Sequence, residues 1–148
     1  MIRIKSLLPT VGQRLLVIVD DQRLTQAAAL LSDGIRHMAV VCDRDGVMVG
    51  VVTRTDIVRQ IQHCDGCACM TACNMVMSRE VISCTPDDWL HEVWSVMKGK
   101  KLQCVPVVDG ERKPIGLLFA EDALEALLSQ VEYEEGLLRD YVMCVGYR

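Results

Sequence analysis

Thr53, Arg54 and Asp56 are the residues of this chain whose types and spacing suit a chemical role. They follow an apolar run at residues 49–52, a pattern that predicts a strand, a turn and then a helix start. A helix amino terminus presents unpaired N–H groups, so an anion can bind there. A hydroxyl and a guanidinium can bind phosphate oxygens, and an ionised carboxylate can accept hydrogen bonds from a ribose diol. The residues therefore indicate a nucleotide site, and the alternative is that Thr55 and Asp56 merely cap a helix.

The chain repeats itself at a shift of 66 residues. Both copies keep apolar, glycine and acidic positions in the same order. The aligned pairs are Leu24 with Leu90, Val41 with Val107, Asp43 with Asp109, Gly50 with Gly116, and Asp56 with Asp122. Similarity at a fixed period indicates two copies of one supersecondary unit. Two copies are too few for a solenoid, so we expect them to pack on each other.

Each copy predicts the order strand, helix, strand, strand, helix. The expected strands of the first copy are residues 15–19, 38–42 and 47–53, and its last helix is 55–62. The expected strands of the second copy are residues 81–84, 105–108 and 115–119. Asp20 and Asp21 are candidate caps for the first helix, and Pro86 suits an early position of its counterpart.

Composition limits the classes of protein to which the chain can belong. Hydrophobic residues make up 51% of the 148 residues, which is ample for a core, and the net charge of −4 argues against a nucleic-acid surface. No apolar run is long enough to cross a bilayer, and Pro9 and Gly12 interrupt any export signal. Eight cysteines without such a signal predict reduced thiols in a cytoplasmic protein.

The repeated unit resembles a known family. A tandem β-α-β-β-α unit with the turn Pro106-Val107-Val108-Asp109-Gly110, and with Gly-x-x-Thr-x-x-Asp before the last helix of the first copy, resembles a CBS domain pair, or Bateman module. The resemblance covers roughly residues 15–128 and implies an α/β (α+β) fold. Two CBS repeats would pack as one pseudo-symmetric module, with small sheets that carry helices on one side. The expected segments are a lead-in (1–14), repeat 1 (15–62), a Cys-rich linker (63–78), repeat 2 (79–131) and a C-terminal extension (132–148).

The resemblance also implies a function. CBS pairs bind adenosine ligands such as AMP, ADP, ATP, NAD(H) or S-adenosylmethionine, and they report energy or metabolite state to a partner protein. We expect a stand-alone regulatory module with AMP or ATP as its ligand, not an enzyme. We also expect a homodimer that acts on an unknown regulated protein, without membrane or nucleic acid.

Two ligand sites follow when the family pattern is carried onto this sequence. The first site comprises Val19, Arg36, His37, Met38, Val51, Thr53, Arg54 and Asp56. The second comprises Thr85, Cys104, Val105, Leu117, Phe119 and Asp122. The second site departs from the pattern, because Phe119 replaces the hydroxyl and Ala120 stands where Arg54 stood. We therefore expect the second site to be weaker, with Phe119 either filling it or stacking on a base.

The linker offers a second function. Cys64, Cys67, Cys69 and Cys73, with His63, could bind zinc or an iron–sulfur cluster or act as a thiol switch. The alternative is a small connection whose cysteines behave as apolar residues. A metal or redox sensor on a CBS scaffold is thus the competing hypothesis. The remaining cysteines, Cys42, Cys84, Cys104 and Cys144, are expected in the core.

The C-terminal extension carries apolar residues beyond the repeat. Leu137, Leu138, Tyr141 and Val142 would be exposed unless something covers them. The cover is either a partner subunit or the chain's own lead-in segment, and the sequence leaves both open.

Overall fold

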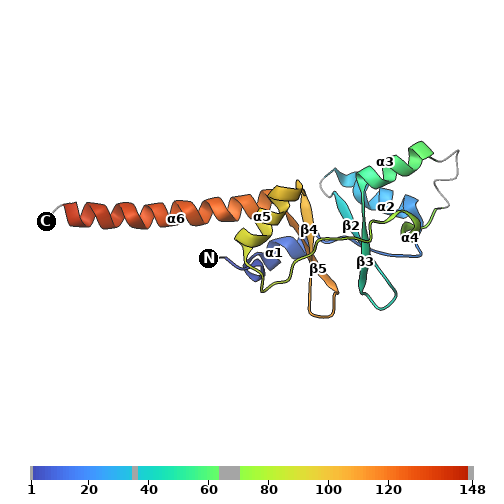
Figure 1. The fold of residues 1–148 in the computed structure, drawn as a ribbon, viewed down its shortest axis with the longest axis horizontal. Coiled ribbons are helices and arrows are strands. Elements are labelled where there is room, and N and C mark those ends of the chain that lie inside the picture. The colour runs from blue at the N-terminus through green and yellow to red at the C-terminus, as the bar shows by residue number, and fades with distance from the viewer. Residues whose placement is uncertain (1, 35–36, 64–70, 147–148) are drawn as a thin grey trace.

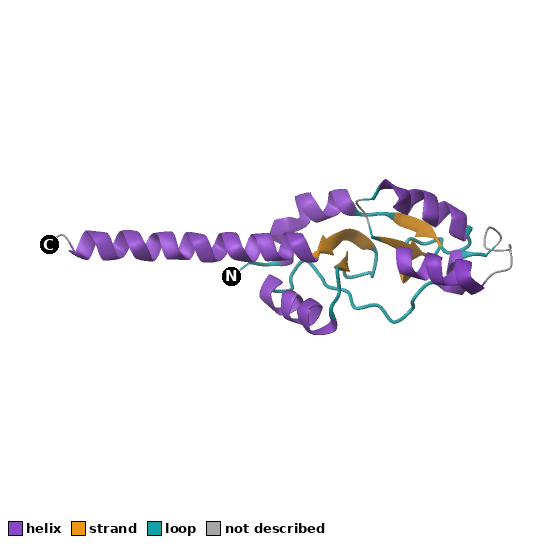
Figure 2. Cartoon of the chain, turned by 90° about the horizontal axis from the view of Figure 1, so that it is seen from above, coloured by secondary structure: helices purple, strands orange, loops and turns teal. Residues whose placement is uncertain are grey.

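The computed structural model describes residues 2–34, 37–63 and 71–146. Two small sheets lie beside each other, each with helices on its outer face, and one long helix projects from the second half (Figure 1). The same layers are seen from above in Figure 2. This arrangement confirms the expected α/β class and the two packed repeats.

Repeat 1 contains a three-stranded sheet. The strands β1 (Val17–Val19), β2 (Met38–Cys42) and β3 (Met48–Thr53) lie in the order β1-β2-β3. β1 is parallel to β2, and β2 is antiparallel to β3. The helices α2 (Leu24–Leu30) and α3 (Arg54–His63) pack on one face, and a 3₁₀ turn, η3 (Leu31–Asp33), follows α2.

Repeat 2 has two strands in the structure. The prediction of a third strand at residues 81–84 is wrong. The strands β4 (Cys104–Val108) and β5 (Pro114–Phe119) form the sheet, and α5 (Leu90–Lys100) and α6 (Ala120–Gly146) complete the repeat. Residue 84 makes one parallel bridge to β4. In repeat 1 the N–H of Val40 donates to the carbonyl of Leu16 (2.8 Å) and extends the ladder. The residue equivalent to Val40 is Pro106, which has no N–H, so the ladder stops.

The predicted caps of α2 and α5 are also wrong. Both helices begin four residues later than Asp20 and Pro86, with Arg23 and Trp89 at the N-cap positions and no capping side chain. The carbonyls of Asp20 and Pro86 instead accept hydrogen bonds from other segments: Asn74 N donates to Asp20 O (3.1 Å), and Lys5 N donates to Pro86 O (2.9 Å). These positions therefore join each repeat to the segment that precedes the other repeat.

Those preceding segments are exchanged between the repeats. The lead-in forms η1 (Ile4–Leu7), α1 (Leu8–Val11) and η2 (Gly12–Arg14) and packs on repeat 2, whereas α4 (Cys73–Val76), which precedes repeat 2, packs on repeat 1 (Figure 1). Ile4 N donates to Asp88 O (3.0 Å), and Cys73 N donates to Gln22 O (2.8 Å). Asp88 and Gln22 are 66 residues apart in the sequence. Each repeat thus depends on the other's leading segment.

Two glycines let these segments approach the sheets. A Cβ at Gly50 would lie 2.7 Å from the Ser78 carbonyl oxygen and 2.8 Å from Met77 Sδ. A Cβ at the equivalent Gly116 would lie 2.9 Å from Val11 Cγ2 and 3.0 Å from backbone atoms of Val11. Contacts this short exclude any larger residue without a shift of the covering segment. The glycines are therefore required by close approach of the exchanged segments.

The inner faces of the two sheets pack against each other. This third cluster joins Val40, Cys42, Met48 and Val51 to Cys104, Val108, Leu117 and Phe119. At one end of it Cys104 Sγ lies 3.8 Å from Met38 Sδ. Met38 and Cys104 are 66 residues apart, so their contact marks the pseudo-two-fold axis that relates the repeats.

The helix α6 continues unbroken from repeat 2 through most of the C-terminal extension. It spans 27 residues and leaves the body as a single helix (Figures 1 and 2). Leu137 and Leu138 are exposed, so this part does not fold back over the lead-in segment. The side chains of Tyr141 and Val142 lie outside the described residues. None of the helices that the structure describes combines the length and the apolar character needed to cross a membrane.

Candidate functional site

A cleft of about 340 Å³ opens between the two repeats. Repeat 1 supplies His37, Met38, Thr53, Arg54 and Thr55, and repeat 2 supplies Lys101, Leu102, Gln103 and Cys104. The volume lies at the lower end of the range for small-molecule sites. The cleft is therefore a shared site, and neither repeat forms it alone.

The sheet register explains why these residues meet. Met38 begins β2 and pairs with Thr53 at the end of β3, and Cys104 begins β4 next to Met38. Because α3 starts directly after Thr53, its first turn also lies at this end of the sheet. The cleft thus combines strand ends from both repeats with the amino terminus of a ten-residue helix.

Thr53 and Asp56 form a reciprocal cap on α3. Asp56 Oδ2 accepts hydrogen bonds from Thr53 N (3.0 Å) and from Thr53 Oγ1 (3.1 Å), and Asp56 N donates to Thr53 Oγ1 (3.3 Å). Asp56 is buried, and its other oxygen lies 3.8 Å from Arg59 Nη1. This geometry is that of a capping box. The capping alternative considered for Asp56 is therefore realised, and Asp56 is not among the residues that line the cleft.

The described lining of the cleft is cationic. Arg54 Nε donates to the Leu31 carbonyl (3.1 Å), while Arg54 Nη2 is buried without a hydrogen-bond partner among the described residues. Lys101 follows α5 in a left-handed conformation, with φ of 56°. No carboxylate occurs among the nine residues that line the cleft. Such a lining favours an anionic ligand over a cationic one.

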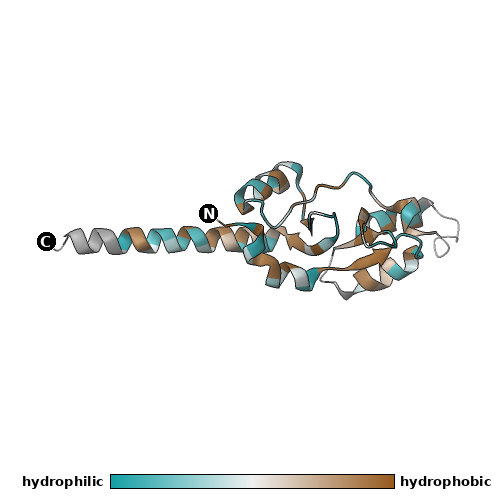
Figure 3. Ribbon diagram, turned by 90° about the horizontal axis from the view of Figure 1, so that it is seen from below, coloured by the Kyte–Doolittle hydropathy of each residue, from teal (hydrophilic) through white to brown (hydrophobic). Residues whose placement is uncertain are grey.

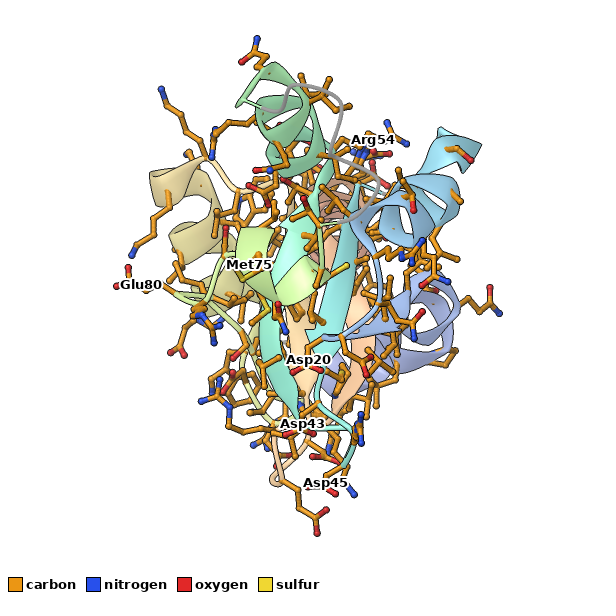
Figure 4. All side chains as sticks on the ribbon, turned by 90° about the vertical axis from the view of Figure 1, so that its right-hand side faces the viewer. Asp20, Asp43, Asp45, Arg54, Met75 and Glu80 are labelled. Carbon is orange, nitrogen blue, oxygen red and sulfur yellow. The ribbon has the colours of Figure 1, made fainter. Side chains whose placement is uncertain are left out.

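Three acidic residues of repeat 1 lie far from the cleft. Asp20, Asp43 and Asp45 lie at the end of the sheet opposite to Arg54 (Figure 4). Asp43 Oδ1 accepts hydrogen bonds from the backbone N–H groups of Asp45 and Val47, so its carboxylate closes the β2–β3 turn. These three carboxylates thus do not offset the cations that line the cleft.

Two residues predicted for the first site, Val19 and Val51, lie away from this cleft. Val19 pairs with Cys42, at the end of β2 opposite to Met38. Val51 is buried between the two sheets. Arg36 lies outside the described residues. His37, Met38, Thr53 and Arg54 are brought together as predicted, and their role in ligand binding stays a prediction.

The carboxylate of the second site is held by the chain's own arginine. Arg14 Nε lies 2.8 Å from Asp122 Oδ2, and Arg14 Nη2 donates to Asp122 Oδ1 (3.2 Å). The Arg14 guanidinium lies 4.5 Å from the centre of the Phe119 ring, and that ring contacts His37 at 5.8 Å between ring centres. Phe119 is almost fully buried. The lead-in segment thus places a cation on the equivalent of Asp56, and Phe119 fills the space beside it.

The other residues predicted for the second site are dispersed. Val105 is fully buried against α5 and α6, and Leu117 is fully buried between the sheets. Thr85 is equivalent to Val19 and lies in a turn, where its N–H donates to Asp88 Oδ2 (2.9 Å). Cys104 lines the shared cleft instead.

The sequence interpretation missed four lining residues: Thr55, Lys101, Leu102 and Gln103. The 66-residue shift contains the signal for two of them, because Leu102 and Gln103 are equivalent to the predicted Arg36 and His37. Lys101 lacked such a signal, since its counterpart is the apolar Ile35.

The structure places Cys73, one of the candidate metal ligands, in the core of repeat 1. Cys73 is fully buried in the core of repeat 1, and burial raises the pKa of its thiol. Cys64, Cys67 and Cys69 lie outside the described residues, as does the side chain of His63. Among the described residues no group of His, Cys, Asp or Glu could hold a metal ion.

The cysteines expected in the core occupy it, apart from Cys144, whose side chain is outside the described residues. Cys42, Cys84 and Cys104 are buried free thiols. Burial, with a smaller contribution from Asp43, raises the pKa of Cys42 to about 11. Burial, with a contribution from Asp88, raises the pKa of Cys84 to about 12, and burial raises that of Cys104 to about 11. These thiols stay protonated at neutral pH.

Comparison with curated proteins gives partial matches. A homoserine O-acetyltransferase from Methanosphaerula palustris is 28% identical over 116 residues, which cover 76% of this chain and 22% of that protein. The chain spans about a fifth of the length of the first such relatives. The match is therefore to a part of those proteins.

Solved structures share the fold. CBSX2, crystallised in complex with AMP, is similar with a TM-score of 0.74 and 21% identity, over 89% of this chain and 99% of that one. The CBS domain pair of protein MJ0100, in complex with 5′-methylthioadenosine and S-adenosyl-L-methionine, has a TM-score of 0.72 and 21% identity, over 88% of this chain and 98% of that one. The family model of the CBS domain matches this chain twice, at residues 11–63 and at residues 73–129. These two matches cover most of the chain, and it belongs to the CBS domain family.

Proposed function

We propose that the cleft between the repeats binds an adenosine nucleotide, with AMP or ATP as its ligand. The observation that carries this proposal is the cationic lining, in which Arg54 and Lys101 face the cleft without any lining carboxylate. Thr53 and the first turn of α3 add a hydroxyl and backbone N–H groups, which suit phosphate oxygens. Arg54 Nη2 is buried without a hydrogen-bond partner among the described residues, so a movement of the guanidinium that brings this atom to a phosphate would break no hydrogen bond of Nη2.

The solved relatives support the adenosine part of the ligand. One of them holds AMP, and another holds 5′-methylthioadenosine and S-adenosyl-L-methionine. S-adenosylmethionine carries a net positive charge, whereas AMP and ATP are anions. A cleft lined by cations discriminates against the former, so the phosphate-bearing nucleotides are the ligands that fit this chain.

A regulatory role follows from this kind of site. The described lining presents no carboxylate and no His–nucleophile pair in contact, which general acid–base or covalent catalysis would require. The acetyltransferase activity of the partial relatives is not transferred, since the chain matches about a fifth of their length. We infer a homodimeric module that reports nucleotide state to a partner protein.

Calorimetric titration of the full chain with AMP, ATP, NADH and S-adenosylmethionine tests the proposal. AMP and ATP should bind with one equivalent per chain, and S-adenosylmethionine should bind at least roughly tenfold more weakly, which is about 1.4 kcal/mol. Absence of heat with all four ligands would overturn nucleotide binding. Equal affinity for AMP and S-adenosylmethionine would overturn the phosphate assignment.

A further inference from the structure

The exposed half of α6 lacks a cover among the described residues. The helix spans 27 residues, or about 40 Å. Its first turns pack on repeat 2 through Ala120, Ala123, Ala126 and Leu127, but every described side chain from 131 to 139 is exposed, Gly136 apart. Most of the stability of a helix in a protein comes from packing of its apolar face and not from helix propensity. The exposed half of α6 lacks such packing from the described part of its own chain.

Four of the six exposed large apolar residues in the described part of α6 follow a coiled-coil spacing, whereas Tyr133 and Leu137 do not. Leu124, Leu128, Val131 and Leu138 are 42%, 51%, 50% and 65% exposed. Their separations of four, three and seven residues match alternating d and a positions of a heptad, with Glu135 at the a position between the last two. Brown, apolar segments recur along the helix in Figure 3. The helix thus presents a continuous seam for another helix.

An open hollow lies along the first part of this seam. Its volume is about 450 Å³, and Leu124 and Leu128 supply its apolar lining. Glu121, Glu125 and Glu132 form its acidic sides together with Ser129. A second helix can therefore follow the seam from repeat 2 outward.

Charge selects the partner and its direction. Arg139 is the only base in the sequence of α6, and it occupies an e position, whereas Glu134 occupies the preceding g position. In a parallel, in-register pair, each g residue faces the e residue five positions later on the other helix. Glu134 of one copy would then face Arg139 of the other, twice by symmetry. An antiparallel pair sets e against e and g against g, which loses both contacts.

We propose that α6 of two copies pairs as a parallel, two-stranded coiled coil. The occupant of the seam is a second copy of this chain. The proposal rests on the homodimer inferred above and names its surface, but it does not depend on nucleotide binding. Glu121 and Glu135 both fall at a positions and would face their own counterparts in the in-register pair, so like-charge repulsion at these two positions lowers the stability of the dimer.

Sedimentation equilibrium of the full chain tests the seam. Wild type should be a dimer, and Leu128→Glu should raise the dissociation constant by at least about a hundredfold, because it puts a charge in the seam. Glutamate keeps helix propensity, so the variant retains its fold. Tyr133→Glu is the matched control, because Tyr133 is 67% exposed and lies at an f position outside the seam. Glu135→Leu should tighten the dimer.

Charge-reversal substitutions test whether the two α6 helices pair in parallel. Glu134→Lys and Arg139→Glu should each weaken the dimer about three- to tenfold, and the double exchange should restore it. A double variant as weak as the single ones overturns the parallel pairing. A wild-type dimer that Leu128→Glu leaves intact overturns the seam and leaves the homodimer standing. A wild type that remains monomeric overturns both, while nucleotide binding by that monomer would still stand.

Discussion

Arg14 Nε and Asp122 Oδ2 are 2.8 Å apart, so the lead-in segment is joined by an ion pair to the last helix of repeat 2. The carboxylate of Asp122 is equivalent to that of Asp56, which is held by Thr53 in repeat 1. The equivalent carboxylates of Asp56 and Asp122 thus have different partners in the two repeats. The difference follows from Phe119, which offers no hydroxyl to its own helix start.

The ion pair predicts a measurable coupling. A double-mutant cycle of Arg14→Ala and Asp122→Ala should give an interaction of about 1–2 kcal/mol in the free energy of unfolding, because both side chains are largely buried. The Arg3–Asp87 pair is the control. It is longer (3.9 Å) and more exposed, and its coupling should be below about 0.5 kcal/mol. Equal couplings for the two pairs would show that the Arg14 contact has no special weight.

Lys101 has a left-handed backbone conformation, so its substitution by glycine removes the charge without lowering stability. Lys101→Gly should leave the free energy of unfolding unchanged or raise it by up to about 1 kcal/mol, because glycine adopts a φ of 56° without strain. The same change removes a cation from the cleft, so AMP affinity should fall roughly three- to tenfold.

The neighbouring lysine provides the comparison. Lys100 ends α5 and does not line the cleft. Lys100→Gly should lower stability by up to about 1 kcal/mol and leave AMP affinity unchanged. If Lys100→Gly and Lys101→Gly lower the affinity for AMP by the same factor, Lys101 acts through the net charge of the protein and not through a contact in the cleft.

The exchanged segments make Gly116 sensitive to substitution. Gly116→Ala should lower the free energy of unfolding by about 1–3 kcal/mol, because its Cβ would lie 2.9–3.0 Å from Val11 atoms, two of them backbone. Gly99→Ala is the control, since a Cβ at this α5 position meets nothing within 4 Å and alanine favours the helix. Chemical denaturation measures both. A tolerated Gly116→Ala would contradict the close packing of the lead-in segment on repeat 2.

The buried thiols predict a loss of stability at high pH. The pKa of Cys84 is raised to about 12 in the folded chain, from 9.0. Between these values the unfolded chain loses this proton and the folded chain keeps it, so the free energy of unfolding falls as pH rises. The thiol's contribution is fully present below about pH 8 and declines by about 1.4 kcal/mol per pH unit above 9. Denaturation of wild type and Cys84→Ala at pH 8 and pH 10 measures it: the stability difference should shrink, and a constant difference would contradict the buried thiol.

The sequence predicted the repeat and most of the strands because these depend on local apolar patterns and on a fixed shift. The local apolar pattern placed Thr53 and Arg54 at the end of a strand that leads into a helix, as the structure shows. The 66-residue shift makes Met38 equivalent to Cys104, and these two side chains lie in contact. The missing strand at residues 81–84 depends on Pro106, more than twenty residues away in sequence, through one absent N–H. A local pattern does not report that loss.

Contacts between distant segments were beyond the sequence pattern. The lead-in segment could pack on either repeat by its apolar residues alone, and the ion pair of Arg14 with Asp122 spans 108 positions. The cleft was predicted as two separate sites, because each copy was read by itself. Pseudo-symmetric packing instead brings Lys101 and Cys104 into the first site.

Cocrystallisation of the full chain with AMP measures the central proposal most directly. One nucleotide should occupy the cleft between the repeats, with its phosphate within hydrogen-bonding distance of Arg54 and Lys101. Arg14 should remain on Asp122. A nucleotide bound beside Asp122 with Arg14 displaced, or a cleft that stays empty at saturating AMP, would contradict the account.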